Sequence, residues 1–327
     1  MQLDLQSINI QPIRNTFDHL VRRFGDKPAT RYQEGTYDIQ QTSLFHYKPT
    51  WEPDKEIFDV TRTALKMRDW YDLKHPRQYY YGTYTIARAK QQDNADATFQ
   101  YVLDEGLADD LSATAKDLIL RVLVPARHLE WGANMNNTFI SSYGFGTAID
   151  AAATFAAMDR LGIAQNISRI GLAVGGEPAL DEAKQVWLNA PEWQPLRRYV
   201  ENSFVLKDWF ELFIVQNLVL DALLYPFLYG NVAKAVTKAG SPLYSLSTSF
   251  MKEWHVESNR WVDAVVKTAV AESAENKALI AGWVATYRAQ VLEGIKALAD
   301  TVFGADAETV VTAINDDFAV RLGKLGL

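Results

Sequence analysis

Histidine is the residue whose spacing would most directly reveal a metal site in this chain. The sequence contains five histidines and no cysteine. A di-iron site in a helical bundle uses two Glu-x-x-His pairs, because residues i and i+3 project from one face of a helix. The residues three positions before the histidines are Thr16, Ser43, Asp72, Pro125 and Lys252. Only Asp72 before His75 approximates the pair, and Pro76 follows at once, so we interpret it as a solvated helix end.

Other motifs that carry chemistry are missing as well. The sequence has neither an HExxH zinc motif nor a GxSxG nucleophile elbow. Gly144, Gly146, Gly175 and Gly176 match no phosphate-binding pattern and follow no strand-like segment, so we predict helix breaks or close packing points there. The lack of cysteine excludes disulfides, iron–sulfur clusters and thiol catalysis. Scattered Ser, His and Asp side chains could still meet in space, and the sequence leaves that open.

The pattern of apolar residues is helical over most of the chain. From Asp54 onward apolar residues recur at helical spacing, and this first segment should end near His75. A second run starts at Pro76, a residue that suits a first helical turn. Further helices are predicted over residues 93–126, 127–142, 146–165, 178–190, 194–204, 208–229, 251–271, 274–303 and 306–322. No strand pattern competes, so we predict an all-α fold with a four-helix core and further helices outside it.

Residues 1–53 differ from the rest of the chain. They show no sustained helical or strand period, so they cannot bury enough apolar surface to form a core of their own. Their aromatic residues are Tyr32, Tyr37, Phe45, Tyr47 and Trp51. We therefore predict an extended N-terminal arm over 1–53 that lies on another subunit, followed by a helical domain over 54–327.

Composition and charge restrict the class of function. A net charge of −7 argues against a nucleic-acid groove, which needs a basic stripe. The N-terminus lacks the pattern of a signal peptide. The longest apolar stretch, 209–229, is interrupted by charged residues such as Glu211 and Asp221, so we expect a core helix and no membrane span. A cytoplasmic location is expected. The 12% of aromatic residues fits either a large core or an extensive contact surface.

Three sequence blocks resemble a known family. They are DWYDLKHPRQYYYGTYTIARAK at residues 69–90, ARHLEWGANMN at 126–136 and WHVESNRWVDAVV at 254–266. The first, rich in tyrosine, is the most specific. They resemble β subunits of the hydroxylase component of bacterial multicomponent monooxygenases, in the phenol hydroxylase and toluene monooxygenase branch. The resemblance extends over essentially the whole chain.

This resemblance implies a function within a larger assembly. The family combines α, β and γ subunits in two copies each, together with a regulatory protein and a reductase that uses NADH. The α subunit holds the di-iron centre that hydroxylates an aromatic ring with dioxygen. The β subunit has a ferritin-like bundle that has lost the metal ligands. The chain is therefore expected to be structural, with no catalytic, cofactor or metal-binding residue, and to support the catalytic subunit.

The resemblance also singles out four positions as remnants of a lost metal site. Where α subunits carry Glu-x-x-His, this chain has Asp159 with Gly162 and Glu257 with Arg260. We predict that the Arg260 guanidinium lies in the bundle, paired with Asp159 or Glu257, because a fixed cation can replace the metal charge. Without the resemblance, the polar residues on apolar helices would be interpreted as buried ion pairs or polar rims; these are Glu211, Asp221, Asp159, Arg160, Glu257 and Arg260. Glu130 and Asp221 are candidates for the two remaining carboxylates.

A subunit interface is predicted at the tyrosine-rich block and the arm. Its residues are Tyr79, Tyr80, Tyr81, Tyr84 and Trp51. No single helix face contains residues 79, 80 and 81, so at least one should point away from this chain's core. Two alternatives stand beside this account: an independent di-iron oxygenase with unusual ligands, and a helical scaffold or binding protein unrelated to oxygenases.

Overall fold

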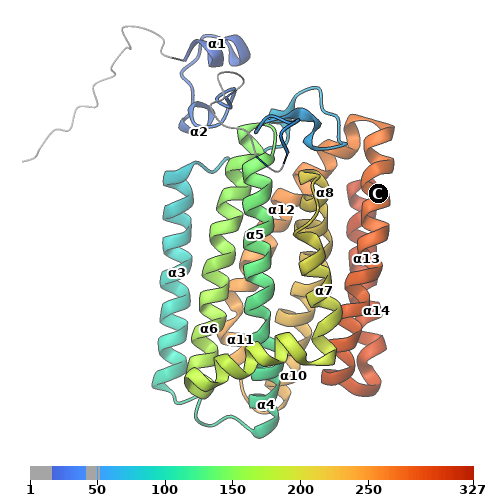
Figure 1. The fold of residues 1–327 in the computed structure, drawn as a ribbon. Coiled ribbons are helices and arrows are strands. Elements are labelled where there is room, and N and C mark those ends of the chain that lie inside the picture. The colour runs from blue at the N-terminus through green and yellow to red at the C-terminus, as the bar shows by residue number, and fades with distance from the viewer. Residues whose placement is uncertain (1–16, 42–49, 51) are drawn as a thin grey trace, which may run out of the picture.

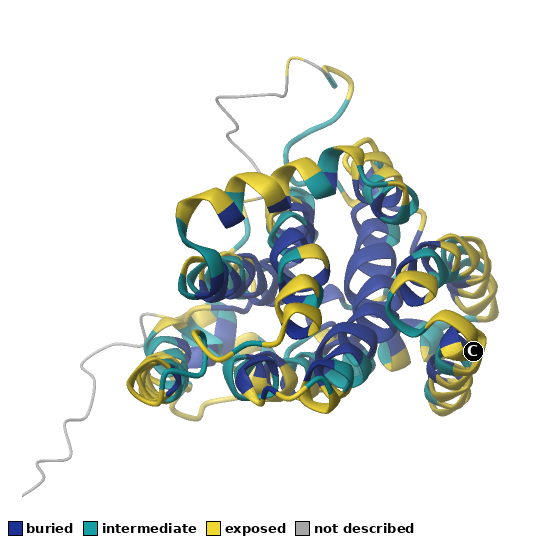
Figure 2. Ribbon diagram, turned by 90° about the horizontal axis from the view of Figure 1, so that it is seen from below, coloured by how far each residue is buried: buried dark blue, intermediate teal, exposed yellow. Residues whose placement is uncertain are grey.

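The computed structural model describes residues 17–41, 50 and 52–327, and in this part of the chain every regular element is helical. Long helices stand side by side in a bundle, and two short helices lie above one end of it (Figure 1). The buried residues concentrate on the inward faces of the long helices (Figure 2). The predicted all-α fold is confirmed.

The hairpin of α5 (Arg127–Tyr143) and α6 (Thr147–Asn189) forms one half of the core. The two helices are joined by a tight connection in which Gly146 has φ +98°, a conformation that glycine adopts without steric cost. Further on, α6 is kinked at Gly176, where φ is +66°, just before Pro178. The prediction of helix breaks at these glycines is confirmed.

A second, almost fully buried rod runs through the centre of the bundle. It consists of α8 (Trp209–Phe213), the π-helix η6 (Ile214–Leu220), α9 (Asp221–Tyr225), the π-helix η7 (Pro226–Val232) and α10 (Ala233–Lys238). By length and composition this rod could cross a membrane, with a mean hydropathy of 1.6 in its most apolar window. However, 94% of that window is buried inside the chain, as expected of the core helix that the sequence predicts.

Four elements make the inner bundle, and other helices cover it. α12 (Ser249–Glu272) packs against the central rod and, with α5 and α6, completes the predicted four-helix core. The longer outer helices are α3 (Tyr81–Asp104), α7 (Gln194–Ser203), α13 (Ala274–Phe303) and α14 (Ala307–Leu325). The shorter elements are α4 (Ala113–Leu118), η3 (Ile119–Leu123), η4 (Val124–Ala126), η5 (Pro191–Trp193), α11 (Leu243–Ser247) and η8 (Gly304–Asp306).

Two of the predicted helices are wrong. Residues 54–75 form only the 3₁₀ turns η1 (Val60–Arg62) and η2 (Trp70–Asp72). The side chains of Asp59 and Asp69 accept hydrogen bonds from the backbone N–H groups of Thr61 and Tyr71. These bonds stabilise short turns, and no α-helix follows them. The predicted helix 93–126 is in fact the end of α3, a connection over 105–112, and the short elements α4, η3 and η4.

The N-terminal region is less extended than predicted. Within residues 17–41 the chain forms α1 (Asp18–Phe24) and α2 (Arg31–Glu34). Tyr32 and Tyr37 are buried there, and Tyr37 stacks on Tyr71 of the main domain at 5.4 Å between ring centroids. The region therefore finds part of its core on its own chain. Phe45, Tyr47 and Trp51 lie outside the described residues.

Candidate functional site

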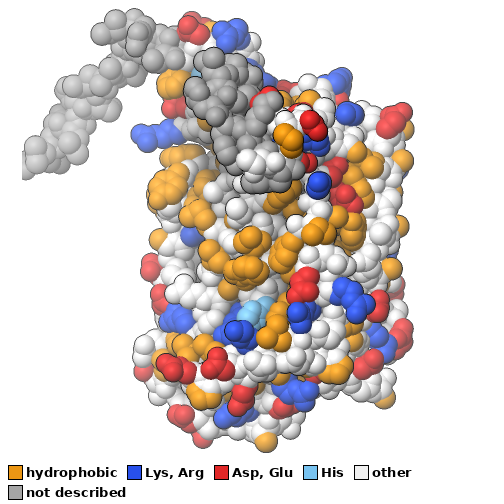
Figure 3. All heavy atoms as spheres, viewed as in Figure 1, with side chains coloured by type: hydrophobic (Ala, Val, Ile, Leu, Met, Phe, Trp, Pro, Cys, Tyr) orange, Lys and Arg blue, Asp and Glu red, His pale blue; other side chains and the backbone are white. Residues whose placement is uncertain are grey.

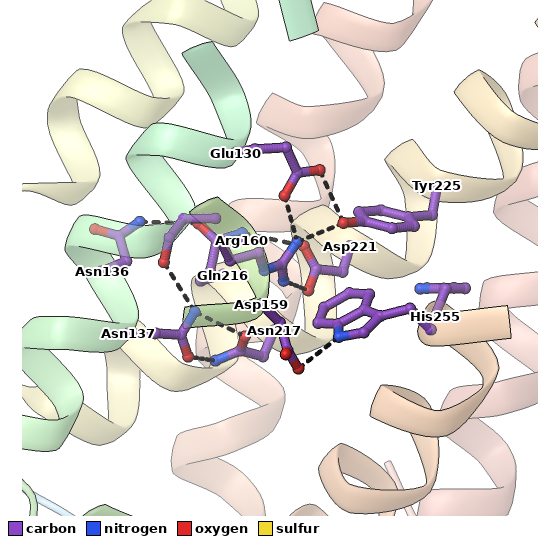
Figure 4. A network of polar contacts seen from close by, with 12 residues as sticks. Glu130, Asn136, Asn137, Asp159, Arg160, Gln216, Asn217, Asp221, Tyr225 and His255 are labelled. Carbon is purple, nitrogen blue, oxygen red and sulfur yellow. Dashed lines mark hydrogen bonds and ion pairs between the residues drawn. The ribbon is translucent and has the colours of Figure 1, made fainter. Parts of the chain in front are cut away.

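Each helix of the inner bundle brings one polar side chain to the same level of the core (Figure 4). These are Glu130 from α5, Arg160 from α6, Asp221 from α9 and His255 from α12. Glu130, Arg160 and Asp221 are each no more than 2% exposed. Their burial follows from helical spacing, since each lies on the inward stripe of its helix.

Arg160 lies between the two carboxylates and holds both. Its Nη1 donates to Glu130 Oε2 at 3.1 Å, and its Nη2 donates to Asp221 Oδ2. Nη1 also donates to the Tyr225 hydroxyl at 2.8 Å, and that hydroxyl in turn donates to Glu130 Oε1 at 2.8 Å. The Gln216 amide donates to Asp221 Oδ1 at 3.0 Å. These five residues form a closed network that we call the Arg160 cluster.

In the Arg160 cluster two buried acids share one buried cation, and this arrangement shifts the pKa values of all three. Burial raises the pKa of Glu130 and of Asp221, and the charge of Arg160 offsets only part of that effect. Burial would lower the pKa of Arg160, but the adjacent Asp221 and Glu130 raise it overall. Arg160 is therefore a permanent cation, and no proton exchange is expected at this side chain.

His255 is close to the cluster but is not bonded to it. Its ring stacks on Tyr225 at 4.8 Å between centroids, and its Nε2 hydrogen-bonds with the Asn259 amide at 3.0 Å. Burial, together with the cations Arg321 and Arg160, lowers the pKa of His255 to about 3. The imidazole is therefore neutral at physiological pH.

A ladder of amides extends the polar layer between α5 and the central rod (Figure 4). Asn137 and Asn217 exchange hydrogen bonds of 3.2 and 3.0 Å. Asn136 donates to Gln216 Oε1 at 2.9 Å, which connects the ladder to the Arg160 cluster. A buried network whose members satisfy one another fixes the relative rotation of its helices.

A second arginine–carboxylate group, the Arg88 cluster, lies where α3 meets α6 and α12. Arg88 on α3 donates two hydrogen bonds of 2.8 Å to the Asp159 carboxylate. Arg88 also donates to Glu257 at 3.1 Å, and Glu257 pairs with Arg77 at 3.1 Å. Burial would lower the pKa of Arg88, but Asp159 and Glu257 raise it overall. Tyr84 is the fifth member of the cluster and donates to Asp159 at 2.8 Å.

One side chain separates the two clusters. The indole Nε1 of Trp254 donates to Asp159 at 2.8 Å, while the Arg160 guanidinium lies 4.4 Å from the centroid of a Trp254 ring. A cavity of about 20 Å³ beside Arg88 has room for roughly one water molecule. It is therefore too small for an aromatic ring.

The four predicted remnant positions divide into two groups. Asp159 and Glu257 are buried and share Arg88, so the structure brings these two together. Gly162 is partly exposed, and a Cβ there would meet nothing within 4 Å. Arg260 is exposed and has no ion pair with any residue that the structure describes. The prediction that Arg260 lies in the bundle is therefore wrong.

The error lies in the helical register. On α12 the inward residues are Trp254, Glu257 and Trp261, so position 260 points outward. On α6 both Asp159 and Arg160 are buried, but it is Arg160 that reaches Glu130 and Asp221, and the residue three positions after it is the buried Ile163. Glu130 and Asp221, the candidates for the two remaining carboxylates, do lie close together, and both accept hydrogen bonds from Arg160. Sequence reasoning missed the roles of Arg160, Arg88 and Tyr225.

The predicted interface tyrosines have different environments. Tyr81 is 70% exposed, which confirms that one of the block points away from the core. Tyr79 and Tyr80 are half-buried. Tyr84 is only 4% exposed because it packs on Phe155 and donates to Asp159, so its assignment to an interface is wrong.

The antiparallel four-helix core, with one polar residue from each helix at one level, defines a ferritin-like helical bundle. The family model described as Methane/Phenol/Alkene Hydroxylase matches residues 51–273, and this chain belongs to that family. The resemblance predicted from the three sequence blocks is confirmed.

Comparison with individual relatives shows which branch of the family this chain is similar to. The chain is 43% identical to the oxygenase component DmpL of phenol 2-monooxygenase from Pseudomonas sp. (strain CF600), over all of this chain and 98% of the relative. It is 23% identical to the β subunit of the toluene-4-monooxygenase hydroxylase component from Ectopseudomonas mendocina, over 85% of this chain and 87% of the relative. The crystal structure of xenon-pressurized phenol hydroxylase from Pseudomonas sp. OX1 superposes with a TM-score of 0.93 at 40% identity, covering 99% of this chain and 98% of that one. A scaffold unrelated to oxygenases is thereby excluded.

The side chains at the ferritin-like metal position do not fit a di-iron centre. Such a centre requires four carboxylates and two histidines from the four helices. Here Arg160 occupies the space between Glu130 and Asp221, and Ile163 stands at the i+3 position of α6. No group of three or more His, Cys, Asp or Glu side chains able to hold a metal ion occurs among the described residues.

Proposed function

We propose that this chain is a structural, non-catalytic subunit of the hydroxylase of a phenol- or toluene-type monooxygenase. In that assembly a separate catalytic subunit would hold the di-iron centre and hydroxylate the aromatic ring with dioxygen. A small subunit, a regulatory protein and an NADH-dependent reductase would complete the system. A cytoplasmic location is part of the same proposal.

The proposal that this subunit is non-catalytic rests on the position of Arg160. A guanidinium within hydrogen-bonding distance of both Glu130 and Asp221 supplies the positive charge that metal ions would otherwise supply. Arg160 is permanently charged and packed against Trp254, so its guanidinium occupies the place between the two acids that a metal ion would have to take.

The proposal that this chain assembles with partner subunits rests on an exposed apolar surface over α5, α6 and the end of α7, which we call the α5–α6 face. Its members are Trp131 (52% exposed), Met135 (45%), Met158 (46%), Leu161 (49%), Phe204 (38%) and Val205 (76%). Hydrophobic side chains gather over these helices on the face shown in Figure 3. Large contiguous apolar patches are rare on monomers and mark interaction sites. An obligate contact here would be expected to exceed the roughly 1,600 Å² of a standard interface.

Co-expression with the partner subunits tests the proposal. The double substitution Trp131→Glu/Met158→Glu adds two charges to the centre of the α5–α6 face, where an obligate interface would exclude water. We expect the hydroxylase complex to dissociate, measured by analytical ultracentrifugation. Val320→Glu, which adds one charge at an exposed residue on α14, is a control and should leave assembly unchanged. Normal assembly of the double variant would contradict a docking role of this face.

A further inference from the structure

The groove between α3 and α12 has no role in the account above. One face of α3 lines it with Ala87, Lys90 and Gln91, and one face of α12 lines it with Glu253, Val256, Glu257 and Arg260. Arg77 closes one end. These spacings of three, four and seven residues place each set on one side of its helix. The groove is therefore a surface built by two helices that run along each other.

The charges of this groove are unbalanced in favour of cations. Arg77 is already paired with Glu257. Lys90 and Arg260 are exposed, and neither has an ion-pair partner in the part of the chain that the structure describes. Against these two cations stands one exposed acid, Glu253. In a chain whose net charge is −7, this is a local positive site.

Apolar side chains accompany the free cations. Val256, between the charged residues on α12, is exposed in the groove, and Ile86, one helical turn before Lys90 on α3, is exposed beside the groove rather than in its lining. α3 itself contributes only Tyr84 and Val102 as buried residues over 24 positions. A helix that buries so little against its own chain is typically stabilised by contact with something else.

We propose that this groove docks a helix of a partner subunit that carries acidic residues along one edge and apolar residues along the other. Charge complementarity argues for acids, because Lys90 and Arg260 line one groove without partners of their own. The exposed Val256 and Ile86 argue for an amphipathic helix. A small anion is less suitable, because a groove with exposed rim residues cannot enclose a small ligand as binding pockets do.

The proposal rests on the proposed function, since it assigns a second docking site to the same assembly. The test is the co-expressed hydroxylase complex with Lys90→Glu/Arg260→Glu in this chain. Both residues are exposed and unpaired, so the thermal midpoint of the chain should stay unchanged. We expect the dissociation constant of the complex, from a dilution series, to rise by at least about tenfold. The wild-type affinity should also fall with added salt more steeply than that of the variant.

The matched control is Lys277→Glu/Lys324→Glu, which makes the same change in net charge at exposed lysines on α13 and α14. It should leave the dissociation constant unchanged. If the groove variant and the control assemble with equal affinity, the groove proposal is wrong while the proposed function stands. If even the wild-type chain fails to assemble with partner subunits, the proposed function fails and the groove proposal fails with it.

Discussion

The Arg160 cluster and the Arg88 cluster use the same chemistry in different surroundings. Each has one arginine between two carboxylates, and Trp254 contacts both. The Arg160 side chain is 1% exposed and comes from a helix of the inner bundle. The Arg88 side chain is 18% exposed and comes from the outer helix α3. The first cluster therefore fixes three core elements, α5, α6 and the central rod, to each other, whereas the second attaches the outer helix α3 to α6 and α12.

This difference shows which cation balances the acids of each cluster. A ferritin-like core needs positive charge at its centre as long as acids remain there. Arg160 supplies that charge from within the layer, at the level where a di-iron centre would lie. The acids of the Arg88 cluster are farther out and take their cation from a neighbouring helix. An arginine can thus keep a pair of acids in the core of a helical bundle.

The largest expected effect comes from removing the central cation. Arg160→Ala leaves Glu130 and Asp221 buried without a counter-charge, which should lower the free energy of unfolding by about 3–5 kcal/mol. Urea unfolding followed by circular dichroism measures this. The triple variant Arg160→Met/Glu130→Gln/Asp221→Asn removes both signs of charge and should recover most of the loss. A small effect of Arg160→Ala alone would show that water reaches the cluster.

Arg88→Ala should cost less, at about 1–3 kcal/mol. Asp159 would keep its hydrogen bonds from Tyr84 and Trp254, and Glu257 would keep Arg77. The same urea experiment gives the comparison directly. If Arg88→Ala is as damaging as Arg160→Ala, the distinction between a core cluster and an edge cluster is lost.

The smallest effect concerns a histidine beside each cluster. Burial is the main cause that lowers the pKa of His255 to about 3 and that of His75 to about 4. A lowered histidine pKa stabilises the fold fully above the unfolded value of about 6.5, and this stabilisation is lost as pH falls towards the folded value. His255→Gln and His75→Gln should each reduce the stability lost between pH 7 and pH 5 by about 1–2 kcal/mol. Unchanged pH dependence would mean that these imidazoles already titrate normally.

The sequence predicted the class of fold and the long core helices well. Helical periodicity is strong where helices are buried, as in 208–229, and the glycines at 146 and 176 were correctly interpreted as breaks. The helical prediction failed at residues 54–75, because the side chains of Asp59 and Asp69 cap short 3₁₀ turns there instead of longer helices. For α2, the Thr30 and Gln33 capping box was a signal in the sequence that was overlooked.

On α6 the residue that reaches the two central acids, Arg160, is one position after the predicted Asp159. Motif spacing alone selected Asp159, whereas the apolar stripe of α6 through Ala153, Ala156, Ile163 and Ile167 would have placed Arg160 inside. No local pattern could have identified Arg88, because its partners Asp159 and Glu257 are 71 and 169 residues away in the chain. Such contacts exist only once the bundle is assembled.

The iron content of the assembled hydroxylase tests most directly whether Arg160 supplies the charge that a metal would otherwise supply in this chain. If Arg160 stands in for the metal charge, this chain contributes no iron, and each set of one catalytic, one structural and one small subunit should contain about two iron ions. Replacing the acids of this chain together with their arginine, as in Arg160→Met/Glu130→Gln/Asp221→Asn, should leave that content unchanged. About four iron ions per set, with about half lost in the triple variant, would contradict the account.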